Sequence, residues 1–267
     1  MLLNPALNSA RPLMVVGLPR CGTRFIANAF NEHPAVHLNG EIPHVTMKAA
    51  VKFVTATDEF FAGRDRVLTN RNTAYVPVES GWTSHRRELL YSMWASLPKS
   101  VPAALPDHAV DWYGHKTPSH DQFWEFYRDF FAGSGPKYVF CMRGFADNYI
   151  SRDAIGAKPI AQVAKQYRTA VNRYADMKEA LGDDVSLFIL EDLREGGVDY
   201  LREVLFDRLG IPVSADVLTR IDPNRPANSS AQKGVEKRSL NDVEQAFIAK
   251  NPDLVEALDA ARSAQRI

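Results

Sequence analysis

The 267-residue chain lacks several features that mark whole classes of protein. Cys21 and Cys141 are its two cysteines, too few for a disulfide-stabilised secreted scaffold. No apolar run reaches about 18 residues, so no membrane-spanning helix is expected. The first residues lack the charged-then-apolar order of a signal peptide. The expected location is therefore a reducing compartment, the cytoplasm.

The chain also lacks an excess of charge of either sign. Lys and Arg number 32, and so do Asp and Glu. Without a net field, neither nucleic acid nor a membrane surface is an expected partner, and any cationic site must be local. Hydrophobic residues make up 45% of the sequence, enough for a sizeable core, and we expect a single domain over residues 1–267.

Short apolar runs alternate with helical patterns along the chain. The runs typical of strands lie at 13–16, 138–142 and 185–190, with a weaker one at 110–113. Apolar residues recur at helical spacing within 123–131, 161–181 and 201–209. This alternation predicts an α/β fold with a central parallel sheet flanked by helices. In such sheets, ligands bind at the carboxyl ends of the strands.

Other local signals are less regular. Residues 63–82 and 99–111 show no clear periodicity, which predicts loops over the site or plain connections. A Ser119-x-x-Gln122 pair is expected to form a capping box before the helix at 123–131. Ser239, three residues before Asp242, is expected to cap the final helical region.

The most informative stretch is MVVGLPRCGTR at residues 14–24. An apolar strand runs into a loop bounded by Gly17 and Gly22, and Thr23 then opens a helix. Backbone N–H groups converge at such a junction, and the helix dipole favours negative charge. The spacing matches a nucleotide P-loop, but Thr23 and Arg24 stand where that motif needs Lys and then Ser or Thr. The loop's own cation, Arg20, lies inside it, which predicts an anion bound without magnesium.

A second motif follows the apolar run at 138–142. Arg143 stands at the expected end of the strand, and Ser151 lies two turns into the next helical pattern. The guanidinium of Arg143 and the hydroxyl of Ser151 are suited to share one anion. Taken alone, an Arg at the end of a strand is more often a structural ion-pair partner.

Together, the two motifs resemble those of sulfotransferases that use 3′-phosphoadenosine 5′-phosphosulfate (PAPS). The first resembles the family's 5′-phosphosulfate loop, which is followed by an apolar helix and His-Pro, here His33-Pro34. The second resembles its 3′-phosphate motif. Glu191-Asp192-Leu193 after an apolar run is similar to a further family feature. The resemblance implies a P-loop-like sulfotransferase fold in which PAPS is the donor, PAP the product and no metal is required. The cofactor contacts it implies in the first loop are Pro19, Arg20, Cys21, Gly22, Thr23 and Arg24, with Arg24 departing from the family's usual Thr or Ser.

The resemblance also implies residues for the transfer itself. Glu41 lies where carbohydrate and tyrosylprotein sulfotransferases carry their general base, although a Glu before Ile42-Pro43 also fits a helix N-terminus. Lys116, in His115-Lys116-Thr117-Pro118, takes the place of the lysine that neutralises the departing phosphate. Arg20 is expected to assist. His115 is a rival base, and His37 and His44 are weaker candidates.

A polar, basic segment lies near the end of the sequence. Its residues Ser230, Lys233, Lys237 and Arg238 resemble a loop that closes the family's nucleotide site on the 3′-phosphate. An ordinary basic surface loop explains the segment equally well.

The predicted reaction is therefore in-line transfer of a sulfuryl group from PAPS to a hydroxyl or amine. The acceptor is expected to be a carbohydrate, lipid-linked glycan, phenol or peptide. Two alternatives stay open: a P-loop kinase of a small metabolite, and a non-catalytic PAP-binding module. The kinase leaves Thr23, Arg24 and the second motif unexplained, and the binding module gives no reason for Glu41 and Lys116.

Overall fold

A five-stranded sheet forms the centre of the computed structural model, which describes residues 7, 9–70, 79–96, 108–156, 158–224 and 238–265. All strands are parallel, in the order β2-β3-β1-β4-β5. Their bounds are β1 Arg11–Gly17, β2 Val36–Asn39, β3 Trp112–Lys116, β4 Lys137–Met142 and β5 Val185–Ile189. The predicted α/β fold with a parallel sheet is confirmed. The weak strand expected at 110–113 lies two to three residues later, as β3, and β2 was not expected.

β1 lies in the middle of the sheet and is buried after its first residue. Such continuous burial is typical of parallel strands with helices on both faces, and explains why an unbroken apolar run signals this strand. Met14 is in register with His115 of β3, and Gly17 with Cys141 of β4. Because the strands are parallel, the residues following all five lie at one edge of the sheet.

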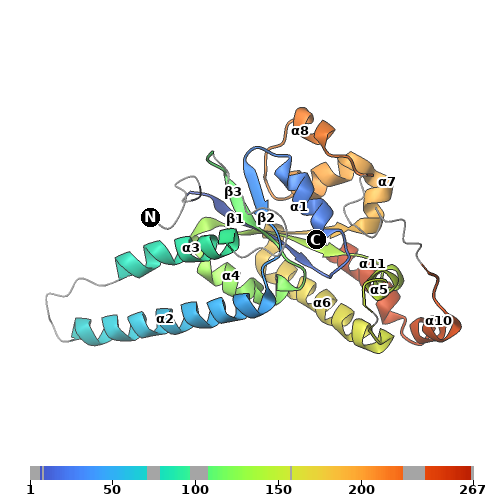
Figure 1. The fold of residues 1–267 in the computed structure, drawn as a ribbon, viewed down its shortest axis with the longest axis horizontal. Helices are drawn as coiled ribbons and strands as arrows, with labels where there is room; N and C mark the ends of the chain where they lie inside the picture. The colour runs from blue at the N-terminus through green and yellow to red at the C-terminus, as the bar shows by residue number, and fades with distance from the viewer. Residues whose placement is uncertain are drawn as a thin grey trace.

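Helices cover both faces of the sheet. Figure 1 shows α1, α7 and α8 on one side and α3, α4 and α6 on the other, with α11 beside α6. The α-helices are α1 Thr23–Asn31, α2 His44–Asn70, α3 Glu79–Ser96, α4 Trp124–Phe130, α5 Phe145–Asp153, α6 Ile160–Leu181, α7 Leu190–Leu201, α8 Ala215–Arg220, α10 Asp242–Ala249 and α11 Asp253–Gln265. Shorter 3₁₀ turns are η2 His120–Phe123, η3 Ala132–Ser134 and η4 Gly182–Asp184, and η5 Arg202–Asp207 is a π-helical turn. None of the described helices combines the length and the apolar character needed to cross a bilayer.

The expectation of an irregular stretch at 63–82 is wrong for much of its length. α2 continues to Asn70, and α3 begins at Glu79, while residues 71–78 lie outside the described part of the chain. α2 and α3 run side by side away from the sheet, and Arg86 of α3 pairs with Asp58 of α2 at 3.1 Å. This part of the sequence resembles a loop because its apolar residues show no regular helical period. Of the second stretch, 108–111 forms an irregular segment before β3, and 99–107 lies outside the described residues.

The predictions for the two helix caps are also wrong. Ser119 adopts a left-handed backbone (φ 65°), and its side chain makes no cap hydrogen bond. Its backbone N–H instead donates to the Gly17 carbonyl at 2.7 Å, which ties the turn after β3 to the end of β1. The cap of α10 is Asn241, which forms a capping box with Glu244. A Ser-x-x-Gln or Ser-x-x-Asp spacing is therefore too common a signal to place a helix start by itself.

Candidate functional site

The charged residues predicted to act together follow different strands and meet at the carboxyl edge of the sheet. Arg20 comes three residues after β1, Glu41 two residues after β2, and Arg143 directly after β4. Lys116 is the last residue of β3. The parallel topology therefore brings together side chains that are more than 120 residues apart in sequence.

The loop between β1 and α1 depends on two glycines with positive φ. Gly17 has φ 104°, and a Cβ there would lie 2.4 Å from the carbonyl oxygen of Cys141. Gly22 has φ 86°, stands at the N-cap of α1, and would place a Cβ 3.1 Å from Phe188. Both positions exclude larger residues, because L-amino acids disfavour this backbone and the neighbouring atoms leave no room. The loop thus turns tightly and presents backbone amides at the start of α1.

The side chains of this loop have different surroundings. Cys21 is buried, its Sγ accepts from the Asn148 amide at 3.2 Å, and burial raises the pKa of its thiol. Thr23 is also buried, whereas Arg24 is exposed. Asn148 also donates to the Pro19 carbonyl at 2.8 Å. The loop is therefore held against α5 through Pro19 and Cys21.

Arg20 links the two predicted motifs. It has a left-handed backbone (φ 69°), which is unfavourable for a residue with a Cβ and is found mainly at functional sites. Its Nε donates to Oγ of Ser151 in α5 at 3.2 Å. The loop arginine and the serine of the second motif are therefore in direct contact, although the two motifs are far apart in sequence.

The arginines of this site repel one another. The pKa of Arg20 is lowered, first by burial and then by the positive charges of Arg143 and Arg24. Arg143 is buried and balanced by two carboxylates, Asp147 at 3.1 Å and Glu191 at 3.6 Å. A cluster of cations at a helix N-terminus is the arrangement expected of a polyanion site.

Arg152 was not among the site residues predicted from the sequence motifs. It is 7% exposed, its Nη2 donates to Gln166, and its Nη1 has no hydrogen-bond partner in the described part of the chain. No carboxylate among the described residues forms an ion pair with it. Its pKa is lowered by burial. A buried guanidinium without a counter-charge is costly, so a bound anion would stabilise it. The sequence signal that could have identified Arg152 is its position directly after Ser151.

Glu41 and Lys116 form a close ion pair. Lys116 Nζ donates to Glu41 Oε1 at 2.6 Å, with the lysine side chain 4% exposed and that of Glu41 39% exposed. Burial lowers the pKa of Lys116, an effect that the contact with Glu41 opposes. The backbone N–H of Ile42 donates to Thr117 Oγ1 at 3.0 Å, which holds the two segments together. A carboxylate and an ammonium thus lie in direct contact at the carboxyl edge of the sheet.

The surroundings of His115 argue against the prediction that it is a base. The residue is fully buried, with Nδ1 3.0 Å from Thr117 Oγ1 and Nε2 3.1 Å from the Tyr127 hydroxyl. Its ring packs edge-on against Trp94. Burial holds its pKa well below the ordinary value. With both nitrogens occupied inside an aromatic cluster, His115 has a place in the core.

The two weaker histidine candidates also have other contacts. His37 stacks on Tyr113, and His44, the first residue of α2, lies with Nδ1 3.0 Å from the Gln122 amide. Burial lowers the pKa of both imidazoles.

Arg238 does not have the free guanidinium expected of a phosphate ligand. It pairs with Asp153 and with Glu244 at 2.7 Å each, and lies over the ring of Tyr149. The prediction that it binds the nucleotide is therefore not supported, because carboxylates already occupy its donors. Ser230, Lys233 and Lys237 lie outside the described residues.

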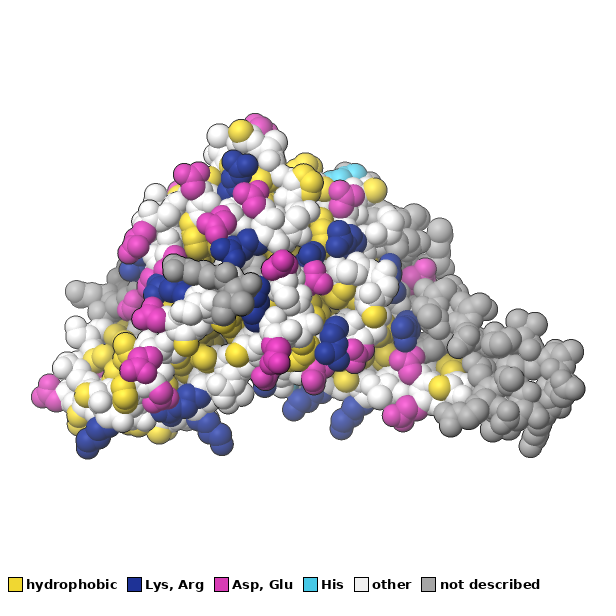
Figure 2. Space-filling model, turned by 180° about the vertical axis from the view of Figure 1, so that it is seen from behind, with side chains coloured by type: hydrophobic (Ala, Val, Ile, Leu, Met, Phe, Trp, Pro, Cys, Tyr) yellow, Lys and Arg dark blue, Asp and Glu magenta, His cyan; other side chains and the backbone are white. Residues whose placement is uncertain are grey.

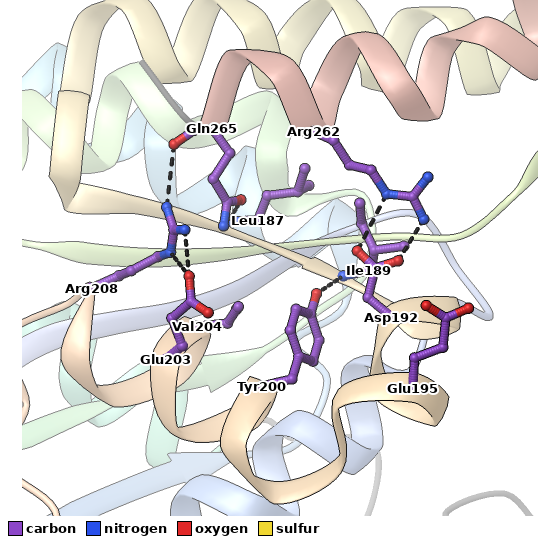
Figure 3. A pocket seen from close by; sticks show the side chains of 10 residues that line it. All are labelled: Leu187, Ile189, Asp192, Glu195, Tyr200, Glu203, Val204, Arg208, Arg262 and Gln265. Atoms are coloured by element: carbon purple, nitrogen blue, oxygen red, sulfur yellow. Dashed lines mark hydrogen bonds and ion pairs between the residues drawn. The ribbon is translucent and has the colours of Figure 1, made fainter.

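A cavity of about 570 Å³ lies away from these residues, between β5, α7, η5 and α11 (Figure 3). Four of its charged side chains form two pairs: Arg262 with Asp192 at 2.5 Å, and Arg208 with Glu203 at 2.6 Å. Along its floor, the outward N–H groups of β5 are occupied, that of Leu187 by the Gln265 side chain at 2.8 Å and that of Ile189 by the Tyr200 hydroxyl at 2.7 Å. None of the predicted site residues lines it.

Figure 2 shows acidic and basic side chains interspersed over the described part of the face seen from behind. The described residues contain no group of three or more His, Cys, Asp or Glu side chains placed to hold a metal ion.

Comparison with known proteins gives the family. A search of curated proteins finds no match. Among solved structures, mouse sulfotransferase SULT7A1 complexed with PAP is 12% identical, with 98% of this chain and 91% of that chain covered and a TM-score of 0.53. Sulfotransferase STF9 from Mycobacterium avium is 15% identical, with 93% and 78% covered and a TM-score of 0.48. The first likeness supports the fold. The profile described as "Sulfotransferase family" matches residues 12–193, from β1 to the start of α7. The chain therefore belongs to the sulfotransferase family.

Proposed function

We propose that this chain transfers a sulfuryl group from PAPS to an acceptor hydroxyl or amine and releases PAP. The proposal depends on one observation: Arg20, Arg143 and Ser151 converge on a glycine-bounded loop at the same sheet edge as the Glu41–Lys116 pair. PAP in the mouse SULT7A1 complex is consistent with this donor.

The residues present fit a donor with anionic groups at two positions. The repulsion among Arg20, Arg24 and Arg143 would be relieved by negative charge between them. The Nη1 of Arg152, which has no hydrogen-bond partner among the described residues, is a buried donor of the kind that anions bind.

The roles we assign follow from these positions. The backbone amides of Gly22 and Thr23, with Arg20, hold the phosphosulfate, and Arg143 and Ser151 hold the 3′-phosphate. PAPS supplies an activated sulfuryl group whose departure leaves negative charge on a phosphate oxygen. Holding both reactants in line supplies most of the catalysis, as in phosphoryl transfer.

Lys116 and Glu41 act on the two sides of the transfer. An ammonium has three donors, so Lys116 can keep its bond to Glu41 and still donate to the phosphate oxygen on which charge develops. Glu41 is partly exposed and able to meet an acceptor, from which its carboxylate removes the hydroxyl proton. The ion pair with Lys116 also orients the Glu41 carboxylate toward the acceptor.

The decisive experiment compares ligands before it tests acceptors. Thermal shifts are measured with PAP and with ATP plus magnesium, and radiolabelled PAPS is then incubated with panels of carbohydrates, lipid-linked glycans, phenols and peptides. The proposal expects stabilisation by PAP and label transfer to one panel. Stronger stabilisation by ATP with magnesium would favour a kinase, and PAP binding with no transfer to any panel would favour a binding module. Arg143→Gln, with Arg128→Gln as a partly exposed control on α4, shows whether PAP stabilisation arises at this site.

A further inference from the structure

Arg24 is the cation of the site whose charge has no counterpart in the part of the chain that the structure describes. It is the second residue of α1, and it is exposed. Lys116 and Arg143 each contact a carboxylate, whereas no acidic side chain of a described residue forms an ion pair with Arg24. Arg24 is also the position at which the loop departs from the family pattern. Its charge is therefore available to a bound ligand, and the fold decides which one.

Arg24 lies on the face of α1 that is turned toward β2. At the other end of the same helix, the Asn31 side chain bonds the backbone of Leu38 in β2: its Nδ2 donates to the Leu38 carbonyl at 3.0 Å, and its Oδ1 accepts from the Leu38 N–H at 2.7 Å. Arg24 is seven residues before Asn31, which is about two turns of helix, so both residues share one face. The contact of Asn31 with Leu38 therefore fixes the side of α1 on which Arg24 lies.

Arg24 also lies at about the height of Glu41 above the sheet. α1 begins at the carboxyl edge and β2 ends there, so stepping back along α1 and forward along β2 leads in the same direction. From Asn31 to Arg24 the helix covers about 10 Å, and from Leu38 to Glu41 an extended chain covers up to about 10 Å. Burial lowers the pKa of Lys116, the partner of Glu41, and the positive charge of Arg24 adds to this effect. Arg24 is therefore close to the pair that carries out the transfer.

The order of the strands separates the two ends of the site. Arg143 and Ser151 follow β4, on one side of the central β1, whereas Glu41 and Lys116 belong to β2 and β3 on the other side. The face of α1 that carries Arg24 is turned to the second side, away from the residues assigned to the 3′-phosphate. We propose that Arg24 binds an anionic group of the acceptor, a carboxylate, sulfate or phosphate close to the hydroxyl or amine that receives the sulfuryl group. This inference rests on the proposed function and names its substrate class.

The charges at this end of the site favour such an acceptor. Glu41 and Lys116 are in contact at 2.6 Å and balance each other, which leaves the charge of Arg24 in excess. An acidic acceptor is repelled by the Glu41 carboxylate and by the bound phosphosulfate, and a cation beside them offsets this repulsion. A guanidinium also forms two parallel hydrogen bonds with a carboxylate or sulfate, so Arg24 orients the acceptor as well as attracting it.

Acceptor pairs that differ in one kind of charge test the assignment. The pairs are nitrophenyl glucuronide and its methyl ester, para-hydroxyphenylacetate and its amide, and the peptides Glu-Tyr-Glu and Gln-Tyr-Gln. For a pair that is sulfated, kcat/KM with PAPS should be roughly tenfold higher for the acidic member. Arg24→Thr should abolish this preference, and Arg24→Lys should keep part of it because the charge remains. Arg202→Thr, at an exposed arginine of η5, is the matched control and should keep all of it.

Equal kcat/KM for the two members of every sulfated pair would overturn the proposal, and so would a preference that survives Arg24→Thr. If Arg24→Thr instead weakens PAP binding and leaves the acceptor ratio unchanged, Arg24 belongs to the donor site.

Failure of the proposed function has a different signature, in which PAP binds but no member of any pair is sulfated. Calorimetry on the PAP complex then decides the role of Arg24. The acidic members should still bind more tightly than the neutral ones and lose this advantage in Arg24→Thr. Equal binding, or no binding of any member, would refute the anion site.

Discussion

Replacing Glu41 by Gln tests the proton transfer in the proposed mechanism. Gln keeps the shape of the side chain and a carbonyl oxygen for the bond from Lys116 Nζ, which is 2.6 Å long in the wild type. It removes the negative charge and the ability to accept a proton. Loss of a general base typically slows turnover by roughly 10²–10⁴-fold, or about 3–5 kcal/mol of activation free energy.

The cost to folding should be much smaller. The Lys116 side chain is 4% exposed and loses its counter-charge, but the glutamine amide still accepts its hydrogen bond. The side chain at position 41 is 39% exposed in the wild type, so solvent screens the lost charge. We expect the free energy of unfolding to fall by about 1–2 kcal/mol. Affinity for PAP should be unchanged, because the proposed phosphate ligands are elsewhere.

The assay is single-turnover transfer from labelled PAPS, with PAP affinity measured by calorimetry and folding by chemical denaturation. Glu125→Gln, at an exposed carboxylate on α4, is the matched control. If Glu41→Gln turns over within twofold of the wild type, Glu41 is not the base. If PAP affinity falls together with turnover, the residue contributes to donor binding instead.

Three further predictions follow from the site and its supports. Arg143→Gln should weaken PAP binding roughly 10–100-fold by calorimetry, since it removes a charged donor that is 3% exposed; an unchanged affinity would make Arg143 a structural ion-pair partner. Gly22→Ala should lower both PAP affinity and Tm, because φ 86° costs an alanine about 1–2 kcal/mol and its Cβ would crowd Phe188; a Tm equal to the wild type would contradict this geometry. The pKa of Glu244 is lowered from 4.5 to about 2, chiefly by Arg238, so its ion pair stabilises the fold above pH 4.5 and loses that effect as pH falls toward 2. Denaturation between pH 6 and 3 should therefore show a smaller acid-induced loss of stability in Glu244→Gln, and equal losses would refute the linkage.

The sheet was predictable because its signal is local. β1, β4 and β5 are continuous apolar runs, as strands buried on both faces must be. β2 is only four residues long and was missed, since no period can be read from so short a segment. α2 beyond residue 63 was missed for another reason: the sequence that follows Gly63 is mostly polar and shows no apolar period.

The site was predictable in composition and less so in arrangement. The loop at 17–22 and the Arg143–Ser151 spacing are local, and they located the charged groups. Contacts between distant segments are not encoded in spacing, so the sequence did not reveal the bond from Arg20 to Ser151 or the burial of His115 beside Tyr127. The ion pair between Arg238 and Glu244 could not be predicted for the same reason.

The capped edge of β5 has a consequence for how the protein behaves at high concentration. A strand with free amide donors is a template on which other chains add, and this is one route to fibrils. Gln265 and Tyr200 occupy the donors of Leu187 and Ile189, so a sixth strand would first have to displace both side chains. Cutting the chain before Gln265, or replacing Tyr200 by Phe, should therefore make the protein more prone to aggregate even where its fold survives.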